Sequence, residues 1–181
     1  SSTCLGLRTP LQAALQVLKE RHEKAKALCR KLHKSCAELR GAEELVGRLV
    51  ADDAATLAMI LQTNGLPRLQ QLYLGFGDTG MQALCEGLGR GASPSLRILS
   101  LAPKNLGPAG VEALAAALSR GAMPRLEVLS ISDNPIGNQG VAAMAAPLRK
   151  LPALQYVGLS TCGIGDEGVA SLVANLGKDD F

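Results

Sequence analysis

A strand-like segment of alternating apolar residues recurs along the chain at a nearly constant spacing. Four such segments begin at residues 69, 96, 126 and 154, so that successive starts lie 27, 30 and 28 residues apart. Each segment is followed by a glycine-containing turn and then by apolar residues at helical spacing, in GMQALCEGL, GVEALAAAL, GVAAMAAPL and GVASLVANL. A period of about 20 to 50 residues is typical of repeat architectures, in which each unit buries its apolar face against its neighbours.

The third unit, residues 126–148, indicates most clearly how one repeat folds. Alternation predicts a short strand that turns Leu129 and Ile131 into the core, and the alanine-rich segment after it predicts a helix from about residue 138. Asn134 lies in the turn between them, where its side-chain amide can bond to backbone groups of neighbouring turns. We expect the helix to end or kink just before Pro147, because proline lacks an amide hydrogen.

These units resemble the leucine-rich repeats of the ribonuclease-inhibitor subtype, whose pattern is roughly LxxLxLxxNxIGxxGxxALAxAL. The resemblance covers about residues 57–177, and it departs from the pattern at the asparagine position, where the second unit has Lys104 and the fourth has Cys162. It implies an α/β fold: a leucine-rich-repeat solenoid that forms a short horseshoe arc, with parallel strands on the concave side and helices on the convex side. Such repeats are specific for a fold and say little about function.

The charge distribution divides the chain. Residues 1–50 have a net charge of +5, whereas residues 51–181 have a net charge of −2. We therefore predict a basic amphipathic helical extension over residues 1–50 and a leucine-rich repeat domain over residues 51–181, with about four repeats preceded by a capping helix. The first residue is serine rather than methionine, which suggests a fragment of a longer protein or a processed start.

The spacing of apolar residues predicts one long helix over residues 10–40. Its heptad seam is filled at one position by Leu15, His22, Cys29 and Cys36, and at the other by Leu18, Ala25, Leu32 and Leu39. The seam fits two interpretations: packing against the first repeat, because repeat proteins need caps, or a coiled coil that would allow self-association through residues 11–39. We expect a second helix over residues 43–50 and a third over residues 53–61, with Asp52 or Asp53 as its N-cap.

Motifs of catalysis and of cofactor binding are missing from the sequence. It contains no GxSxG elbow and no GxxxxGK[ST] phosphate loop, and both histidines lie in the predicted front helix. Cys29, His33 and Cys36 would share one face of that helix, but in the absence of a CxxC pair we favour buried thiols over a zinc site. We therefore expect a protein that is not an enzyme, with no catalytic residue, no metal and no cofactor.

Charge and cysteine usage indicate the setting. The run KERHEKAKALCRKLHK at residues 19–34 is basic but has no aromatic anchor, so we favour a solvated surface over binding to a membrane, calmodulin or nucleic acid. No segment is apolar enough for a membrane span. The five cysteines are scattered and odd in number, which is typical of reduced thiols in a cytoplasmic protein.

The concave sheet face is the most credible functional surface in this sequence. It is uncharged and is expected to have Tyr73 and Tyr156 in its end strands, and tyrosine is a favoured interface anchor. The competing interpretation is an idle face. The predicted protein-binding residues are Gln71, Tyr73, Ile98, Ser100, Val128, Ser130, Ser132, Tyr156 and Ser160.

The function that we expect is a non-enzymatic protein–protein interaction scaffold whose partner is another protein. The alternative is GTPase activation, since Ran GTPase-activating proteins use the same repeat subtype. Arg97, Arg125 and Arg149 are the arginines available for that role, although none lies in a motif that matches and the acidic tail of that family is missing.

Overall fold

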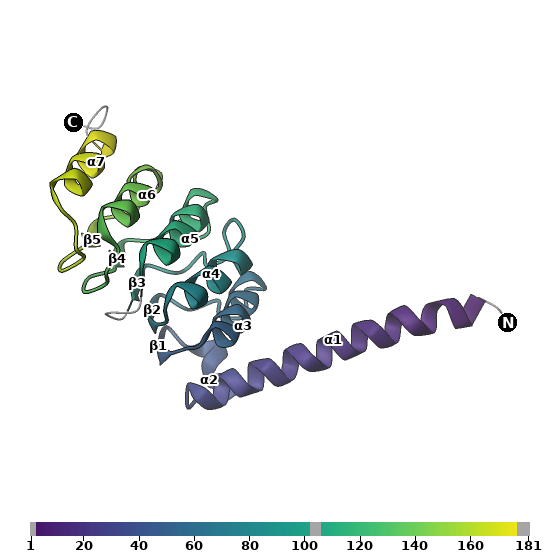
Figure 1. Ribbon diagram of the computed structural model, residues 1–181. Coiled ribbons are helices and arrows are strands. Elements are labelled where there is room, and N and C mark those ends of the chain that lie inside the picture. Colours follow the sequence, from purple (N-terminus) through teal and green to yellow (C-terminus); the bar gives the residue numbers. More distant parts are fainter. Residues whose placement is uncertain (1–2, 102–105, 177–181) are drawn as a thin grey trace.

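The computed structural model describes residues 3–101 and 106–176 (Figure 1). Two helices come first along the chain, and strands then alternate with helices up to the end of the described residues. In chain order the elements are α1 (Thr3–Lys31), α2 (Cys36–Gly41), β1 (Glu44–Arg48), α3 (Ala51–Gln62), β2 (Gln71–Gly75), α4 (Asp78–Gly87), β3 (Ile98–Leu101), α5 (Pro108–Ser119), β4 (Val128–Ser130), α6 (Gly137–Arg149), β5 (Tyr156–Gly158) and α7 (Asp166–Leu176).

The strands form one parallel sheet in the order β1-β2-β3-β4-β5. Each strand leads into a helix that returns the chain to the start of the next strand, and the helices α3 to α7 follow one another along one side of the sheet (Figure 1). The prediction that the segments beginning at residues 69, 96, 126 and 154 lie alongside one another in parallel is confirmed. Each of these strands begins about two residues later than predicted.

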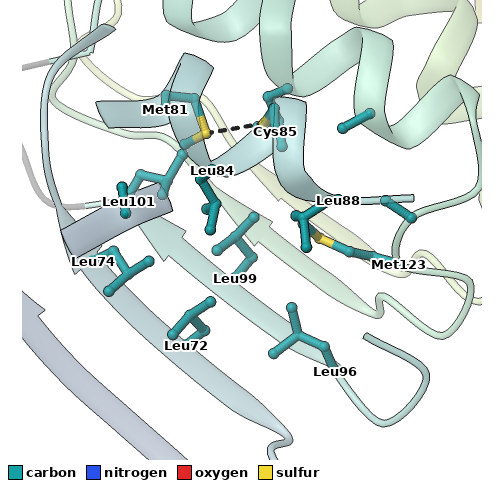
Figure 2. Close-up of a cluster of buried hydrophobic side chains, with 14 of the residues drawn as sticks. Leu72, Leu74, Met81, Leu84, Cys85, Leu88, Leu96, Leu99, Leu101 and Met123 are labelled. Atoms are coloured by element: carbon teal, nitrogen blue, oxygen red, sulfur yellow. Dashed lines mark hydrogen bonds between the residues drawn. The ribbon is translucent and has the colours of Figure 1, made fainter. Parts of the chain in front are cut away.

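The core lies between the sheet and the helices and consists largely of leucine. Leu72 and Leu99 are neighbours in the sheet register, and both are fully buried. They point toward Leu84 and Leu88 of the α4 segment (Figure 2). Leu129 in β4 is completely buried, and so is Ile131 just after that strand, as the alternation predicts. Truncation of one such leucine to alanine typically costs about 2–5 kcal/mol.

Asn134 connects adjacent coils as the sequence predicts. Its Oδ1 accepts a hydrogen bond from the backbone N–H of Leu106 at 3.1 Å, and its Nδ2 donates to the carbonyls of Leu101, Ile131 and Ser132 at 3.4, 3.0 and 3.0 Å. The side chain is completely buried, so these bonds satisfy groups that water cannot reach. In the next coil the thiol of Cys162 donates to the carbonyl of Ile131 at 3.3 Å. Lys104, which holds the corresponding place in the preceding coil, lies outside the described residues.

The front helix begins and ends earlier than predicted. The prediction of one helix over residues 10–40 is wrong, because α1 begins at Thr3 and ends at Lys31, and α2 begins at Cys36. His33 lies between them with a φ of +52°, which no α-helix contains. Ser35 then starts the new helix with a capping box, since its hydroxyl accepts from the N–H of Glu38 at 3.2 Å and the Glu38 carboxylate accepts from the N–H of Ser35 at 2.7 Å.

The predicted helix over residues 43–50 is also wrong, because residues Glu44–Arg48 form the edge strand β1. Leu45 is completely buried beside Leu72 of β2, and the strand extends the sheet by one member. The sheet therefore begins on the N-terminal side of the predicted division at residue 50.

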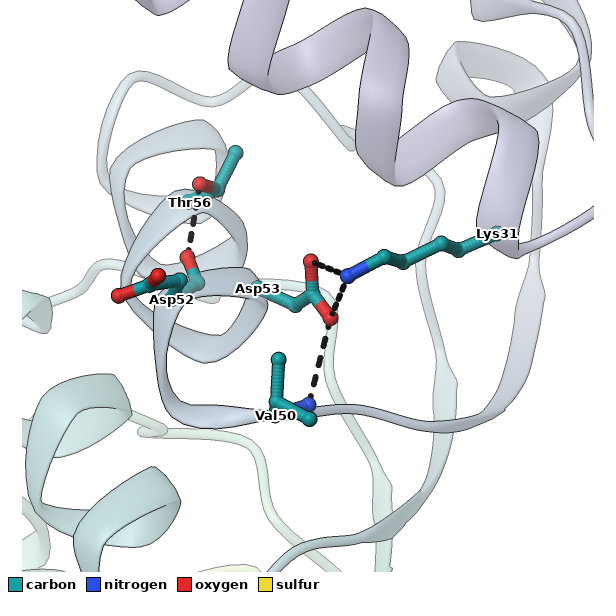
Figure 3. Close-up of polar contacts among 5 residues, drawn as sticks. All are labelled: Lys31, Val50, Asp52, Asp53 and Thr56. Carbon is teal, nitrogen blue, oxygen red and sulfur yellow. Dashed lines mark hydrogen bonds and ion pairs between the residues drawn. The ribbon is translucent and has the colours of Figure 1, made fainter.

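Two helix ends also differ from the prediction. The N-cap of α3 is Val50 rather than Asp52 or Asp53, and Asp53 instead accepts a hydrogen bond from the Val50 N–H at 3.3 Å (Figure 3). Helix α6 continues through Pro147 to Arg149. Because this proline lies in the last turn, it removes a hydrogen bond close to the point where the helix ends.

The last turns of α1 dock on the first coil. Leu28 and Leu32 are buried, and the Nζ of Lys31 lies 2.7 Å from both carboxylate oxygens of Asp53 in α3 (Figure 3). The rest of α1 projects away from the sheet and its helices (Figure 1). Among the described residues, no helix is both long enough and apolar enough to cross a membrane.

Candidate functional site

The face of the sheet that is turned away from the core, here called the open face, carries the predicted protein-binding residues. The register aligns them in rows across the strands. One row is Glu44, Gln71, Ile98, Val128 and Tyr156, and a second row is Val46, Tyr73, Ser100, Ser130 and Gly158. Neighbouring parallel strands are about 4.8 Å apart, so the side chains of each row lie next to one another, and the second row ends at Gly158.

The predicted residues differ in how far they reach solvent. Gln71, Tyr73, Ile98, Ser100, Val128 and Ser130 are half-buried on the open face, whereas Tyr156 is 57% exposed. Ser132 and Ser160 lie in the turns just after β4 and β5, where the Ser132 hydroxyl accepts a hydrogen bond from the Ser160 N–H at 3.2 Å. The structure therefore brings the predicted set to one side of the sheet and its C-terminal turns.

Residues of β1 complete the open face, and the sequence analysis missed them. Glu44, Val46 and Arg48 share the face with Gln71 and Tyr73, because Glu44 pairs in register with Gln71 and Val46 with Tyr73. The expectation that Tyr73 lies in an end strand is wrong, since β1 lies outside β2. The face is also not uncharged, because β1 contributes a carboxylate and a guanidinium.

A hollow of about 290 Å³ lies on the open face between β1 and β3. Val46, whose side chain is 64% exposed, and the half-buried Tyr73 contribute to its lining. The Tyr73 hydroxyl donates to Oε1 of Gln71 at 3.0 Å, which holds the phenol in place across the strand. The complete lining is Val46, Gly47, Arg48, Tyr73, Leu74, Gly75 and Ser100.

Tyr156 belongs to a different hollow, at the C-terminal end of the sheet. That hollow has a volume of about 270 Å³ and is lined by Leu148, Leu151, Leu154, Gln155, Tyr156 and Val157. The two tyrosines that the sequence singled out therefore lie at separate depressions, three strands apart. The strands between them present Ile98 and Val128 in one row and Ser100 and Ser130 in the other.

Arginines gather where the strands begin. Arg68, Arg97 and Arg125 line a polar hollow of about 350 Å³, together with Glu43, Pro67, Gln70 and Ser95. Arg97 is engaged by Glu127, with 3.3 Å between Nη1 and Oε1. Arg149 ends α6 and is not part of this lining. The structure thus brings together Arg97 and Arg125 of the predicted set, but not Arg149.

The thiols of Cys29 and Cys36 meet where α1 and α2 adjoin. Their sulfur atoms are 3.2 Å apart, with Cys29 buried and Cys36 exposed. Burial raises the pKa of Cys29 from its ordinary 9.0 to about 11, and the hydrogen bond with Cys36 adds to the rise. His33 does not lie on a common helix with the two thiols, because the helix ends before it. Within residues 3–101 and 106–176 no three His, Cys, Asp or Glu side chains are grouped to hold a metal ion.

A family model described as "Leucine Rich repeat" matches residues 123–145 and 150–173. These segments span β4 with most of α6 and β5 with most of α7, so each match covers one strand-and-helix coil. A comparison with curated proteins gives no significant match. The matched coils and the parallel sheet with its row of helices support a leucine-rich repeat protein.

Proposed function

We propose that the chain is a non-enzymatic interaction scaffold: a leucine-rich-repeat solenoid of the ribonuclease-inhibitor subtype whose open, concave face binds a partner protein. Leucine-rich repeats are protein-interaction modules, which supports the general role. The observation that favours this face is the hollow between β1 and β3, where Val46 and Tyr73 present apolar surface to solvent. The strand-and-helix form of each coil supports the subtype.

The size of the hollow favours a protein side chain over a small molecule. Its volume of about 290 Å³ is at the lower limit of ligand pockets, which range from about 300 to 1,000 Å³. An apolar or aromatic anchor of a partner would bury the exposed part of Val46 and stack beside the ring of Tyr73. Arg48 lines the same hollow and supplies a guanidinium for a polar contact at the rim.

The experiment compares open-face variants with a control of matched exposure. A protein captured from native lysate by the immobilised chain would be purified, and its affinity measured by titration calorimetry. Tyr73→Ala should weaken binding by roughly 30-fold, the loss typical of an interface anchor, and Val46→Ser should weaken it as well. The control is Val173→Ser in α7, where the valine is 60% exposed and lies on a helix away from the open face.

Two results would argue against the proposal. Affinity that survives both Tyr73→Ala and Val46→Ser would remove the open face from the interface, and equal losses in Val173→Ser would point to general destabilisation. Circular dichroism of each variant shows whether the fold is retained. Tyr156→Ala then tests whether the interface reaches the last strand.

We also propose GTPase activation as the alternative function and the cytoplasm as the location. GTPase activation would show as faster GTP hydrolysis by small GTPases in the presence of the chain, and an unchanged rate would exclude it. The cytoplasm is proposed as the location on cysteine usage alone, since Cys29, Cys36, Cys85 and Cys162 are free thiols.

A further inference from the structure

The projecting part of α1 carries apolar side chains that nothing in the described chain covers. Residues 10–24 are exposed throughout, and Figure 1 shows this part of α1 extending away from the other elements. Leu11 is 64% exposed, Leu15 is 49% exposed and Leu18 is 60% exposed. Single exposed leucines are ordinary, but three on one helix face form a patch that requires an explanation.

The three leucines form a stripe along α1 that continues into its docked end. Residues spaced three, four and seven apart share one face of a helix, and this face runs from Leu11 through Leu15, Leu18 and the exposed His22 to Ala25 and Cys29. Cys29 is buried against the first coil. The apolar face that is exposed at one end of α1 is therefore in contact with the rest of the molecule at the other end.

An apolar hollow lies where the stripe meets the coils. It has a volume of about 170 Å³, and its lining includes both Ala25 and Cys29 from the stripe. The other lining residues are Cys36, Leu39, Arg40, Ile60, Gly65 and Leu66. A helix laid along the stripe would therefore reach an apolar recess with a guanidinium in its lining.

Basic residues flank the stripe on both sides. Lys19 and Lys26 lie at its one border and Arg21 at the other, in the positions that face a partner in a helix pair. Glu20 and Glu23 lie farther round the helix, although the Glu23 carboxylate is 3.0 Å from the Nζ of Lys26. Within the described part of the chain, Lys19 and Arg21 have no ion-pair partner.

This charge pattern discriminates between occupants of the stripe. In a parallel pair of two copies, Arg21 of one copy would face Lys26 of the other. In an antiparallel pair centred on Leu18, the two Lys19 side chains would approach each other. Either arrangement places like charges together, which is unfavourable. A membrane-surface helix is typically anchored by aromatic side chains at the interface, and α1 contains no aromatic residue. Acidic residues at the flanking positions of a partner helix would complement it.

We infer that the stripe Leu11–Leu15–Leu18 binds an acidic amphipathic helix of a partner protein, which lies along α1 and ends at the hollow beside Ala25 and Cys29. The inference goes beyond the proposed function, because it uses a surface separate from the open face. The self-association expected from the sequence is the competing occupant, and the same experiment distinguishes the two.

The test uses the full chain and two synthetic probe peptides of about three heptads. Both peptides have leucine at the seam positions, and they differ only at the flanking positions, which carry glutamate in one and lysine in the other. Fluorescence anisotropy measures the Kd of each labelled peptide. The acidic peptide should bind at least about tenfold more tightly than the basic one, and the difference should shrink at high salt.

Variants of the exposed residues locate the binding surface. Lys19→Glu together with Arg21→Glu should abolish or reverse the preference, and Leu15→Ala should weaken binding of the acidic peptide. Lys24→Glu is the control, because it makes the same lysine-to-glutamate change as Lys19→Glu on the same helix at a position away from the stripe. All of these side chains are exposed, so the fold should be kept, and circular dichroism checks this.

Four outcomes would overturn the inference. Two concern the peptides: equal affinity for both, or no measurable binding of the acidic one. The third is that Lys24→Glu and the paired variant change the affinity for the acidic peptide equally. The fourth is a concentration-dependent dimer of the chain in sedimentation equilibrium that Leu15→Ala dissociates. Tighter binding to phosphatidylserine–phosphatidylcholine vesicles than to the acidic peptide would likewise replace the proposed partner by a membrane surface. None of these results bears on the open face, which is tested by its own variants.

Discussion

Replacement of Asn134 by alanine tests how adjacent coils are held together. The side chain is completely buried in the turn between β4 and α6, and it bonds to backbone groups of its own coil and of the preceding one. Alanine fits the same space without these bonds. The change therefore isolates the polar contribution of one turn from that of the leucine core.

The cost can be estimated bond by bond. The N–H of Leu106 loses its acceptor at a buried position, which costs about 1–3 kcal/mol. The carbonyls of Leu101 and Ser132 lose a donor, at a net cost of about 0.5–1.5 kcal/mol each. The carbonyl of Ile131 keeps the thiol of Cys162 as a donor, so it adds little. Asn134→Ala should therefore lower the free energy of unfolding by about 2–6 kcal/mol.

Urea denaturation followed by far-UV circular dichroism measures this change. Asn138→Ala is the matched control, because Asn138 also accepts a hydrogen bond from the next coil, from the Gly165 N–H at 2.8 Å, but at the surface. Its loss should cost about 1 kcal/mol or less. Both variants replace an asparagine that accepts a hydrogen bond from an adjacent coil, and they differ in burial and in the number of bonds lost.

Asn134→Cys provides an intermediate case. Cys162 shows that a thiol in the corresponding turn can donate to a carbonyl of the preceding coil, so cysteine should retain part of the donor function. It cannot replace the acceptor of the Leu106 N–H. We expect its stability to lie between those of wild type and Asn134→Ala. A loss for Asn134→Ala no larger than that for Asn138→Ala would refute the argument that burial sets the cost.

Three further predictions follow from the packing. Gly87→Ala should lower the free energy of unfolding by about 1–3 kcal/mol, because the added Cβ would lie 2.5 Å from the Cβ of Ala58. This loss is expected even though alanine is the better helix former by about 1 kcal/mol. An unchanged Tm would contradict the prediction. Asp53→Ala should cost about 1–2 kcal/mol of stability through loss of its capping bond to the Val50 N–H. Lys31→Ala should cost less than about 1 kcal/mol, because that side chain is 52% exposed. Equal losses in urea denaturation would refute the assignment of the larger contribution to the capping bond. Burial raises the pKa of Cys85 to about 12. Its thiol should therefore resist iodoacetamide at neutral pH in the native protein and react after unfolding, with peptide mass spectrometry as the readout. Rapid labelling of the native protein would contradict the buried environment of this thiol.

The regular coils could be predicted from the sequence because one period governs strand, turn and helix together. Alternation placed Leu129 and Ile131 inward, and the need to satisfy buried backbone groups assigned Asn134 its role. The sequence does contain a local signal for the break in the front helix, since Ser35 and Glu38 have the spacing of a capping box, which marks the start of a new helix. Apolar periodicity alone continued across these residues and concealed the break.

The open face was predicted only in part because the first coil departs from the repeat where it joins α1. Leu45 precedes its register partner Leu72 by 27 residues, as Leu72 precedes Leu99, so the period does extend to β1. The next inward position of β1 is Gly47, which pairs with the core residue Leu74. A Cβ at Gly47 would lie 2.8 Å from a methyl carbon of Leu32, so this leucine, which directly follows α1, occupies the space that a side chain at position 47 would need.

Gly47 links the candidate site to the front helix, because both lie at the same end of the molecule. With glycine at this inward position β1 lacks the apolar pattern of the other strands, yet it still presents Val46 and Arg48 on the open face. Leu32, which directly follows α1, packs at this position and completes the first coil. The irregular coil therefore contributes both the hollow beside Tyr73 and the docking of the projecting helix, whereas the regular coils that the sequence reveals most clearly provide the framework between them.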